Sequence, residues 1–337
     1  MSDSQSGSSL PRSVVVAGID IGGTKISAIL VDRAGIVLAE STVVTPAREG
    51  GEAMSAAAAA LVRDLERKTG HVAVAAGVGA AGVIDPLTGV VTAASETFSS
   101  WTGFPLADDL SRRLGVATVV ANDVNAFLHG EMSYGAVAGS ADAIGIMLGT
   151  GVGGAIAFGG DIFDGPRGAA GEIGHTPGYG EHVCTCGQIG HLETVASGRS
   201  IGARYSEKVA GTAADSSFVV AERARHGDAT AIATFEQAGR AVALAIATAV
   251  NLLDVRDVVV GGGVRGAWDL LEPALTAALA ENEPVSGYPV FVTPSSLKGR
   301  AVALGAAALA WRRYDAGDQD PTTPHGDDAI KNVRSLS

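Results

Sequence analysis

The chain has 337 residues, enough for two domains of ordinary size, and its 47% hydrophobic and 18% charged content is typical of a globular protein. Its 36 acidic and 24 basic residues give a formal charge of −12, and the absence of a Lys/Arg cluster argues against a nucleic-acid partner. We expect no membrane partner either, because no apolar run is long enough to span a bilayer and residues 1–12 lack the apolar region of a signal peptide. The two cysteines, one residue apart, are poorly placed for a disulfide, which favours a reduced, cytoplasmic compartment.

Strands and helices are expected to alternate in the first part of the chain, as in layered α/β proteins. The polar, glycine- and serine-rich residues 1–12 predict a disordered tail. After it we expect two strands around a glycine turn (14–32), a strand (35–44), a helix (51–69), a buried strand (72–79), a short helix (105–114) and a strand (117–121).

Residues 142–160 repeat the pattern of residues 14–32, in which a buried strand runs into a glycine turn and returns as a second strand. The turn is Gly22-Gly23-Thr24 in the first copy and Gly149-Thr150-Gly151 in the second. Two such copies, about 125 residues apart, predict a duplicated domain. A dinucleotide-binding interpretation of the second turn is disfavoured, because a strand rather than a helix follows it.

The second half of the chain is expected to be richer in helices. We predict mainly helix over residues 194–254, including a long helix at 229–253, then a strand (255–264), a helix (267–281), a strand (289–293) and a last helix (301–313). The predicted domains are therefore residues 13–121, completed by the helix at 301–313, and residues 122–300, with a disordered tail at 315–337.

Both cysteines lie in residues 171–193, GEIGHTPGYGEHVCTCGQIGHLE, together with several histidines. Two thiolates and one or two imidazoles suffice for a tetrahedral zinc site, and we expect this zinc loop at residues 175–191. Glu172 and Glu193 frame the stretch, outside the expected ligands, where they are available to a polar ligand. A loop that has lost its metal stays an alternative.

Two further features point to phosphate chemistry. Glycine turns follow three buried strands, the third being Gly261-Gly262-Gly263, and their backbone N–H groups are suited to phosphate oxygens. Asn122 and Asp123 end a predicted strand, where α/β proteins place their ligands. Asp123 taken alone is equally well explained as the N-cap of the following helix.

These motifs together resemble the ROK family (repressors, open reading frames and sugar kinases) over roughly residues 14–312. The resemblance rests on DIGGTK, GTGVGG, GEIGH, CTCGQIGHLE and VVVGGGV, in that order. It implies the α/β, two-domain, actin-like (hexokinase-like) duplicated fold with an interdomain cleft. It also implies ATP-dependent phosphorylation of a hexose or N-acetylhexosamine hydroxyl, with ATP, Mg²⁺ and structural Zn²⁺ as cofactors, in a homodimer or homotetramer.

The resemblance also implies residue roles. Asp123 matches the catalytic base, which accepts the proton of the attacking sugar hydroxyl. The sugar-binding set matches Asn122, Glu172, His175, Glu193, Gly82 and Thr97. The ATP-binding set matches Asp20, Gly22, Gly23, Thr24, Lys25, Thr150, Gly151, Gly261, Gly262 and Gly263. The zinc ligands match His175, Cys184, Cys186 and His191.

The chain departs from the family's pattern at two places. His191 stands where the usual zinc motif has a third cysteine, so that His182 is an alternative fourth ligand. Thr97 stands in the region where glucose-phosphorylating relatives have an asparagine, so the sugar stays open between the glucose and N-acetylmannosamine types.

Two other functions stay as alternatives, a sugar-sensing transcriptional regulator and a non-catalytic sugar-binding protein. The regulator is disfavoured because the 13 residues before Val14 are too few for a winged helix-turn-helix domain.

Overall fold

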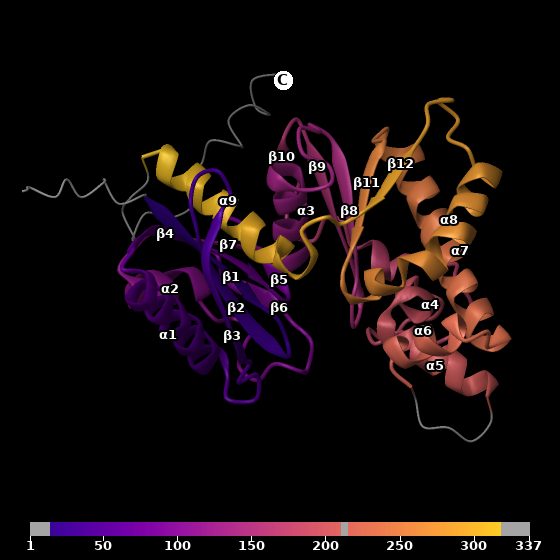
Figure 1. Cartoon of the computed structure of the whole chain (residues 1–337), viewed down its shortest axis with the longest axis horizontal. Helices are drawn as coiled ribbons and strands as arrows, with labels where there is room; N and C mark the ends of the chain where they lie inside the picture. The colour runs from indigo at the N-terminus through magenta and orange to yellow at the C-terminus, as the bar shows by residue number, and fades with distance from the viewer. Residues whose placement is uncertain (1–13, 210–214, 318–337) are drawn as a thin grey trace, which may run out of the picture. The chain divides into compact units, whose positions relative to one another are not determined.

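The computed structural model describes residues 14–209 and 215–317. These residues form two compact units: residues 14–123 with 306–317 make up unit 1, and residues 124–305, with a gap at 210–214, make up unit 2. Each unit combines a β-sheet with helices, and the predicted α/β fold class is confirmed (Figure 1). The tail predicted at residues 1–12 lies outside the described residues, as does the tail predicted at 315–337 apart from residues 315–317.

Unit 1 is built on a five-stranded sheet of order β3-β2-β1-β4-β7. The strands are β1 (Val15–Ile21), β2 (Lys25–Val31), β3 (Val37–Val44), β4 (Ala73–Ala80) and β7 (Thr118–Asn122). β1, β2 and β3 are antiparallel neighbours, whereas β4 and β7 run parallel to β1. Figure 1 shows α1 (Gly51–Thr69) and α2 (Leu106–Leu114) on one side of this sheet and α9 (Ala301–Asp315) on the other. A small hairpin of β5 (Val83–Ile84) and β6 (Val91–Ala93) follows β4.

Unit 2 repeats this sheet with strand order β10-β9-β8-β11-β12. The strands are β8 (Ala143–Leu148), β9 (Val152–Phe158), β10 (Asp161–Ile162), β11 (Asp257–Gly261) and β12 (Phe291–Pro294). Again the first three neighbours are antiparallel and the last two are parallel to the central strand. The repeat predicted from two strands and a turn therefore extends to the order and direction of all five strands in each sheet.

Helices make up most of the rest of unit 2. They are α3 (Asp123–Tyr134), which begins at the last residue of unit 1, and α4 (Glu193–Ala196), α5 (Gly198–Lys208), α6 (Ser217–Arg225), α7 (Ala229–Leu253) and α8 (Trp268–Glu281). Short 3₁₀ helices are η1 (Ile173–His175), η2 (Gly263–Ala267) and η3 (Lys298–Arg300). The Asp228 side chain accepts hydrogen bonds from the Thr230 and Ala231 N–H groups and so fixes the start of α7. None of the described helices is long and apolar enough to cross a membrane.

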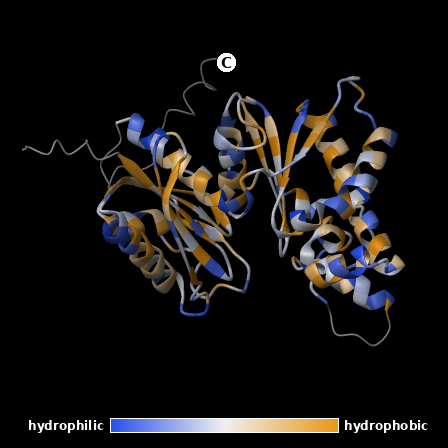
Figure 2. Ribbon diagram, in the orientation of Figure 1, coloured by the Kyte–Doolittle hydropathy of each residue, from blue (hydrophilic) through white to orange (hydrophobic). Residues whose placement is uncertain are grey.

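The hydrophobic residues concentrate in the strands and in the helix faces turned toward them (Figure 2). On β1, six of seven residues are buried, and Asp20 alone is half-buried. Small residues let α9 approach its neighbours closely. A Cβ on Gly77 of β4 would overlap the Ala306 carbonyl oxygen in unit 1, and a Cβ on Gly305 would overlap the Ala126 carbonyl oxygen of α3 in unit 2. The first contact packs α9 against β4, and the second packs it against α3.

The structure extends α9 to Asp315, two residues beyond the predicted helix end. The Arg33 guanidinium donates two hydrogen bonds to the Asp315 carboxylate, at 2.6 and 2.7 Å. This bidentate pair ties the last turn of the helix to unit 1.

Candidate functional site

The first group of predicted site residues lies in unit 1, at the carboxyl ends of parallel strands. Asp20 is on β1, Gly82 follows β4, and Asn122 and Asp123 stand where β7 passes into α3. Strand register aligns Asp20, through β4, with Ala121, the residue before Asn122. Because parallel strands end at one edge of a sheet, residues from three separate segments meet here, in the usual ligand position of α/β proteins.

Asn122 links two of these segments. Its side-chain amide donates a hydrogen bond to the Gly82 carbonyl oxygen at 2.9 Å. Asp123 is the first residue of α3, where the positive end of the helix dipole favours a carboxylate. Asn122 and Gly82, both predicted sugar-binding residues, are therefore held together beside the predicted base.

Asp20 is electrostatically linked to Asp123. Burial and the nearby Asp123 carboxylate raise the pKa of Asp20 to about 7, and Lys25 acts in the opposite direction. Because burial is the larger cause and Asp123 adds a nearby negative charge, this site beside the glycine turn favours the binding of a cation or a proton. Sequence reasoning had placed both residues in the site but had not predicted this interaction.

The first glycine turn is fixed from both sides. The Gly22 N–H donates to the Lys25 carbonyl at 3.1 Å, and the Thr45 hydroxyl donates to the Gly22 carbonyl at 2.7 Å. The exposed Thr97 lies beside the turn, because a Cβ built on Gly23 would be 3.6 Å from Thr97 Cγ2. The turn residues, including Thr24 and the exposed Lys25, are thus close to the loop that carries Thr97.

The second group lies in unit 2 and includes the predicted zinc ligands. His175, Cys184, Cys186 and His191 each offer a donor atom, and these atoms all lie within 4.8 Å of one another. The two Nδ1 atoms are 3.3 Å apart, Cys186 Sγ is 3.3 Å from His191 Nδ1, and Cys184 Sγ is 3.7 Å from His175 Nδ1. His182, the alternative fourth ligand, is not among the four clustered residues.

These distances fit a tetrahedral zinc ion. With usual Zn–N and Zn–S bonds, the edges of such a tetrahedron are about 3.3 Å between two nitrogens and about 3.6 Å between nitrogen and sulfur. Burial raises the pKa of the Cys184 thiol, so metal binding there must displace a proton. Hydrogen bonds from the Cys184 N–H to the Gln188 carbonyl (2.7 Å) and from the Gly187 N–H to the Cys184 carbonyl (2.9 Å) shape the loop around the donors.

Both framing glutamates contact this cluster. His175 turns Nδ1 toward the other donors, and its Nε2 lies 3.9 Å from the exposed Glu172 carboxylate. Glu193, at the start of α4, accepts a hydrogen bond from the Thr185 hydroxyl at 2.7 Å and one from the Val152 N–H at 3.1 Å. The zinc loop and its two carboxylates thus form one connected group.

The second and third glycine turns also meet within unit 2. Gly262, with φ of 86°, packs so closely on the Leu148 carbonyl that a Cβ there would overlap it. The Gly198 N–H, in the first turn of α5, donates to the Gly149 carbonyl at 2.8 Å. The turn with Thr150 and Gly151, the turn at Gly261, Gly262 and Gly263, and the start of α5 therefore lie together. Gly198 was not predicted as a site residue.

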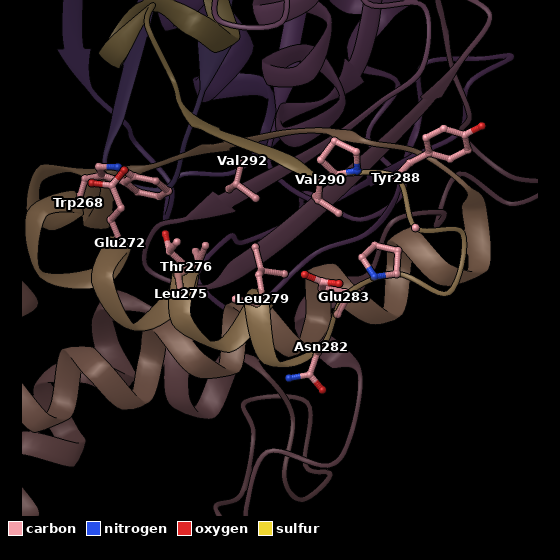
Figure 3. Close-up of a pocket in the computed structure, with 15 residues that line it drawn as sticks. Trp268, Glu272, Leu275, Thr276, Leu279, Asn282, Glu283, Tyr288, Val290 and Val292 are labelled. Carbon is pink, nitrogen blue, oxygen red and sulfur yellow. The ribbon is translucent and has the colours of Figure 1, made fainter.

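One clear pocket of unit 2, of about 420 Å³, is separate from these residues (Figure 3). Its walls come from α8 and from the chain around β12, with Trp268, Leu279, Tyr288 and Val292 among them. No predicted site residue lines it. A more apolar pocket, of about 530 Å³, lies between α7 and residues 171–179 and reaches only Glu172 of the predicted set.

Comparison with known proteins gives the chain its family. The ROK family model matches residues 16–313. The chain is 34% identical over 306 residues to an N-acetylmannosamine kinase of Shigella flexneri, covering 88% of this chain and 98% of the relative. It is 33% identical over 312 residues to a glucokinase of Streptomyces coelicolor, covering 87% and 96%.

A solved structure agrees with these relatives. The ROK family glucokinase from Streptomyces griseus, in complex with glucose and AMPPNP, has a TM-score of 0.78 and 32% identity, covering 88% of this chain and 99% of that chain. The family match extends over nearly all the described residues, and the strand–turn–strand repeat and the Cys/His loop lie within it. The chain therefore belongs to the ROK family.

Proposed function

We propose that the chain transfers a phosphoryl group from ATP to a hydroxyl of a hexose or an N-acetylhexosamine. The observation that carries this proposal is the placement of Asp20 and Asp123 close to one another, beside a glycine turn at the carboxyl ends of β1 and β7. Phosphoryl transfer to an alcohol requires a base for the hydroxyl and groups that manage phosphate charge, and this edge of unit 1 offers both. The kinases among the relatives support the same reaction.

In this reaction Asp123 accepts the proton of the attacking sugar hydroxyl. A positioned base of this kind typically contributes about 10²–10⁴-fold to the rate. The other sugar hydroxyls are bound by polar side-chain and backbone groups, which offer several hydrogen-bond acceptors. We assign this binding to Asn122, Glu172, His175, Glu193, Gly82 and Thr97.

The phosphates of ATP are bound by backbone N–H groups of the glycine turns and by the hydroxyls of Thr24 and Thr150. Lys25 adds a positive charge beside the first turn. The turn at Gly261, Gly262 and Gly263 binds the adenosine part of ATP. Mg²⁺ on the phosphates would offset the negative charge that develops during transfer, and Asp20 is the carboxylate that would face it. Binding of a divalent cation would also favour the ionised form of Asp20, whose pKa is raised to about 7.

Zinc has a structural role in this proposal. His175, Cys184, Cys186 and His191 would hold the ion with all four positions filled, which leaves none open for catalysis. The ion would close the loop that carries His175, which lies beside Glu172, and Thr185, which donates to Glu193. His175 then serves two functions, with Nδ1 toward the metal and Nε2 toward the sugar side.

We further propose the 6-hydroxyl as acceptor and a sugar of the glucose or N-acetylmannosamine type, as in the relatives named above. ADP release should be measured with glucose, N-acetylmannosamine, N-acetylglucosamine, mannose and fructose, against a reaction without sugar. The 6-deoxy form of the accepted sugar is the matched control and should bind without turnover. Sugar binding with no ADP release for any sugar would instead identify a non-catalytic sugar-binding protein.

The assembly is also a proposal. We expect a homodimer or homotetramer, on the basis of the family resemblance. Light scattering across a range of protein concentrations measures the mass directly, and a monomer at every concentration would contradict this expectation.

A further inference from the structure

Glu193 is held by the protein at both of its carboxylate oxygens. The Val152 N–H donates to Oε2 at 3.1 Å, and the Thr185 hydroxyl donates to Oε1 at 2.7 Å. The second glycine turn lies against the same carboxylate, because a Cβ on Gly151 would overlap Oε2. The carboxylate therefore has little freedom to rotate about its last bond.

Thr185 owes its position to the metal-binding loop. It is the single residue between Cys184 and Cys186, and the backbone on both sides is closed by the hydrogen bonds of Cys184 and Gly187 described above. Thr185 is an exposed residue, but its hydroxyl donates a hydrogen bond to Glu193. When the loop is formed, the hydroxyl is thus presented at a fixed point.

A cysteine sulfur lies close to Glu193 Oε1 and to the Thr185 hydroxyl. Cys184 Sγ lies 3.8 Å from Oε1 and 3.9 Å from the Thr185 hydroxyl oxygen. A metal-bound cysteine is a thiolate, so a second anion then stands close to the carboxylate. The Thr185 hydroxyl is the neutral donor that keeps Oε1 in place beside that sulfur.

An ionised carboxylate has about four acceptor positions, and two donors leave capacity on both oxygens. A ligand hydroxyl that meets such a carboxylate finds its acceptors already oriented. Preorganised groups bind more tightly because they lose less freedom when the ligand arrives. Loss of one orienting donor should therefore weaken ligand binding without changing the chemistry of transfer.

We propose that Thr185 is a positioning residue that orients Glu193 for a sugar hydroxyl, and so determines sugar affinity. This inference rests on the proposed function, in which Glu193 binds the sugar. Thr185 reaches Glu193 because it lies between the two metal-binding cysteines, Cys184 and Cys186. Its role is to orient Glu193, whereas the role of the cysteines is to bind the metal.

The test compares Thr185→Val, which removes the hydroxyl at nearly constant volume, with Thr185→Ser, which keeps it. For the accepted sugar, Thr185→Val should raise both KM and the dissociation constant about tenfold, because a hydrogen bond to a charged group is lost. The value of kcat should stay within about twofold, since Asp123 and the phosphate turns are unchanged. Thr185→Ser should restore both constants to within about twofold of the wild type.

Two measurements separate positioning from a general effect on the loop. Zinc content should stay at one ion per chain in both variants. In a double-mutant cycle, Thr185→Val should add little to the loss of sugar affinity caused by Glu193→Ala, because both changes break the same contact. Thr185→Ala, which cannot introduce a clash, repeats the test should the valine variant fold poorly.

Several results would overturn the inference. These are a wild-type sugar dissociation constant in Thr185→Val, a serine variant as weak as the valine variant, additive losses in the cycle, or zinc loss in the valine variant. Failure of the proposed function looks different, because the wild-type protein itself would then release no ADP with any sugar, whether or not it binds one.

Discussion

The two strand–turn–strand repeats hold their carboxylates in opposite ways. In unit 1 the turn at Gly22-Gly23-Thr24 lies beside Asp20, whose pKa is raised to about 7 by burial and by Asp123. In unit 2 the turn at Gly149-Thr150-Gly151 lies against Glu193, which receives hydrogen bonds from Val152 and Thr185. The same backbone pattern thus lies beside Asp20, a carboxyl group whose ionised form is disfavoured by burial, and beside Glu193, a carboxylate that two protein donors hold in place.

The difference indicates that the two copies of a duplicated fold can serve different chemical roles. A carboxyl group whose ionised form is disfavoured by burial and by a nearby carboxylate is suited to protons and cations, and it costs stability when it ionises. A carboxylate with two protein donors is suited to orienting a neutral polar ligand. Five substitutions test the contrast, three in unit 1 and two in unit 2.

The largest effect is expected at Asp123. Asp123→Asn removes the proposed base and should lower kcat at least about a hundredfold, while the dissociation constant of the sugar changes little. Single-turnover kinetics with a parallel binding measurement check both values. Near-normal turnover would contradict the role given to Asp123.

The next effect concerns the buried His191 of the metal cluster, which is 2% exposed. His191→Ala should abolish zinc binding and lower the melting temperature by about 5 °C or more, because metal binding contributes to folding. His182→Ala is the matched control, since His182 lies in the same loop but outside the cluster, and it should retain one zinc per chain. Zinc retained in the first variant and lost in the second would reverse the assignment.

A pair of glycine substitutions compares the two turns directly. An alanine at Gly151 would displace Glu193 Oε2 and break its bond to Val152, which should cost about 1–3 kcal/mol of stability. An alanine at Gly23 meets Thr97 and Phe98 only at 3.6 and 3.5 Å, so the expected change is within about 0.5 kcal/mol. Chemical denaturation measures both, and equal losses would show that the turns do not differ.

The last effect is a pH-dependent gain of stability. Asp20 has a raised folded-state pKa, so the folded protein binds more protons than the unfolded chain between about pH 4 and 7. The ionised carboxylate therefore destabilises the fold increasingly as pH rises through this window. Asp20→Asn should gain roughly 1 kcal/mol at pH 8, after discounting for partial exposure, and almost nothing at pH 4.

Melting temperatures of the Asp20→Asn variant and the wild type at these two pH values, without added magnesium, test this sign. A gain that is the same at both pH values would show that ionisation of Asp20 is not its cause. The same variant should bind Mg²⁺–ATP more weakly, which distinguishes a functional cost from simple stabilisation.

Much of the fold could be predicted because its elements have clear local signals. The helix predicted at 51–69 is α1, which lies between Gly50 and Gly70, and Gly70 closes it in the left-handed conformation. The long helix predicted at 229–253 is α7, with Asp228 as its cap. The short strands β5, β6 and β10, of two or three residues, were not predicted, because a period of two needs a longer run to be visible.

In the candidate site, too, local sequence signals could be predicted, whereas contacts between distant residues could not. Sequence spacing predicted a zinc loop around the two cysteines, and the family resemblance then selected His175 and His191, which cluster with them in the structure. The contact of Thr185 with Glu193 and the coupling of Asp20 to Asp123 depend on loop closure and strand register, which local patterns do not reveal. Thr185 had one visible signal, its place between two predicted ligands.

The central claim, phosphoryl transfer to a sugar hydroxyl, is tested most directly by product stoichiometry. Purified protein with ATP, Mg²⁺ and each sugar of the panel should form ADP and one sugar phosphate in equal amounts. We predict this for at least one sugar of the glucose or N-acetylmannosamine type, with the product lost in Asp123→Asn. ADP formation that does not depend on sugar, or no sugar phosphate from any sugar, would contradict the claim.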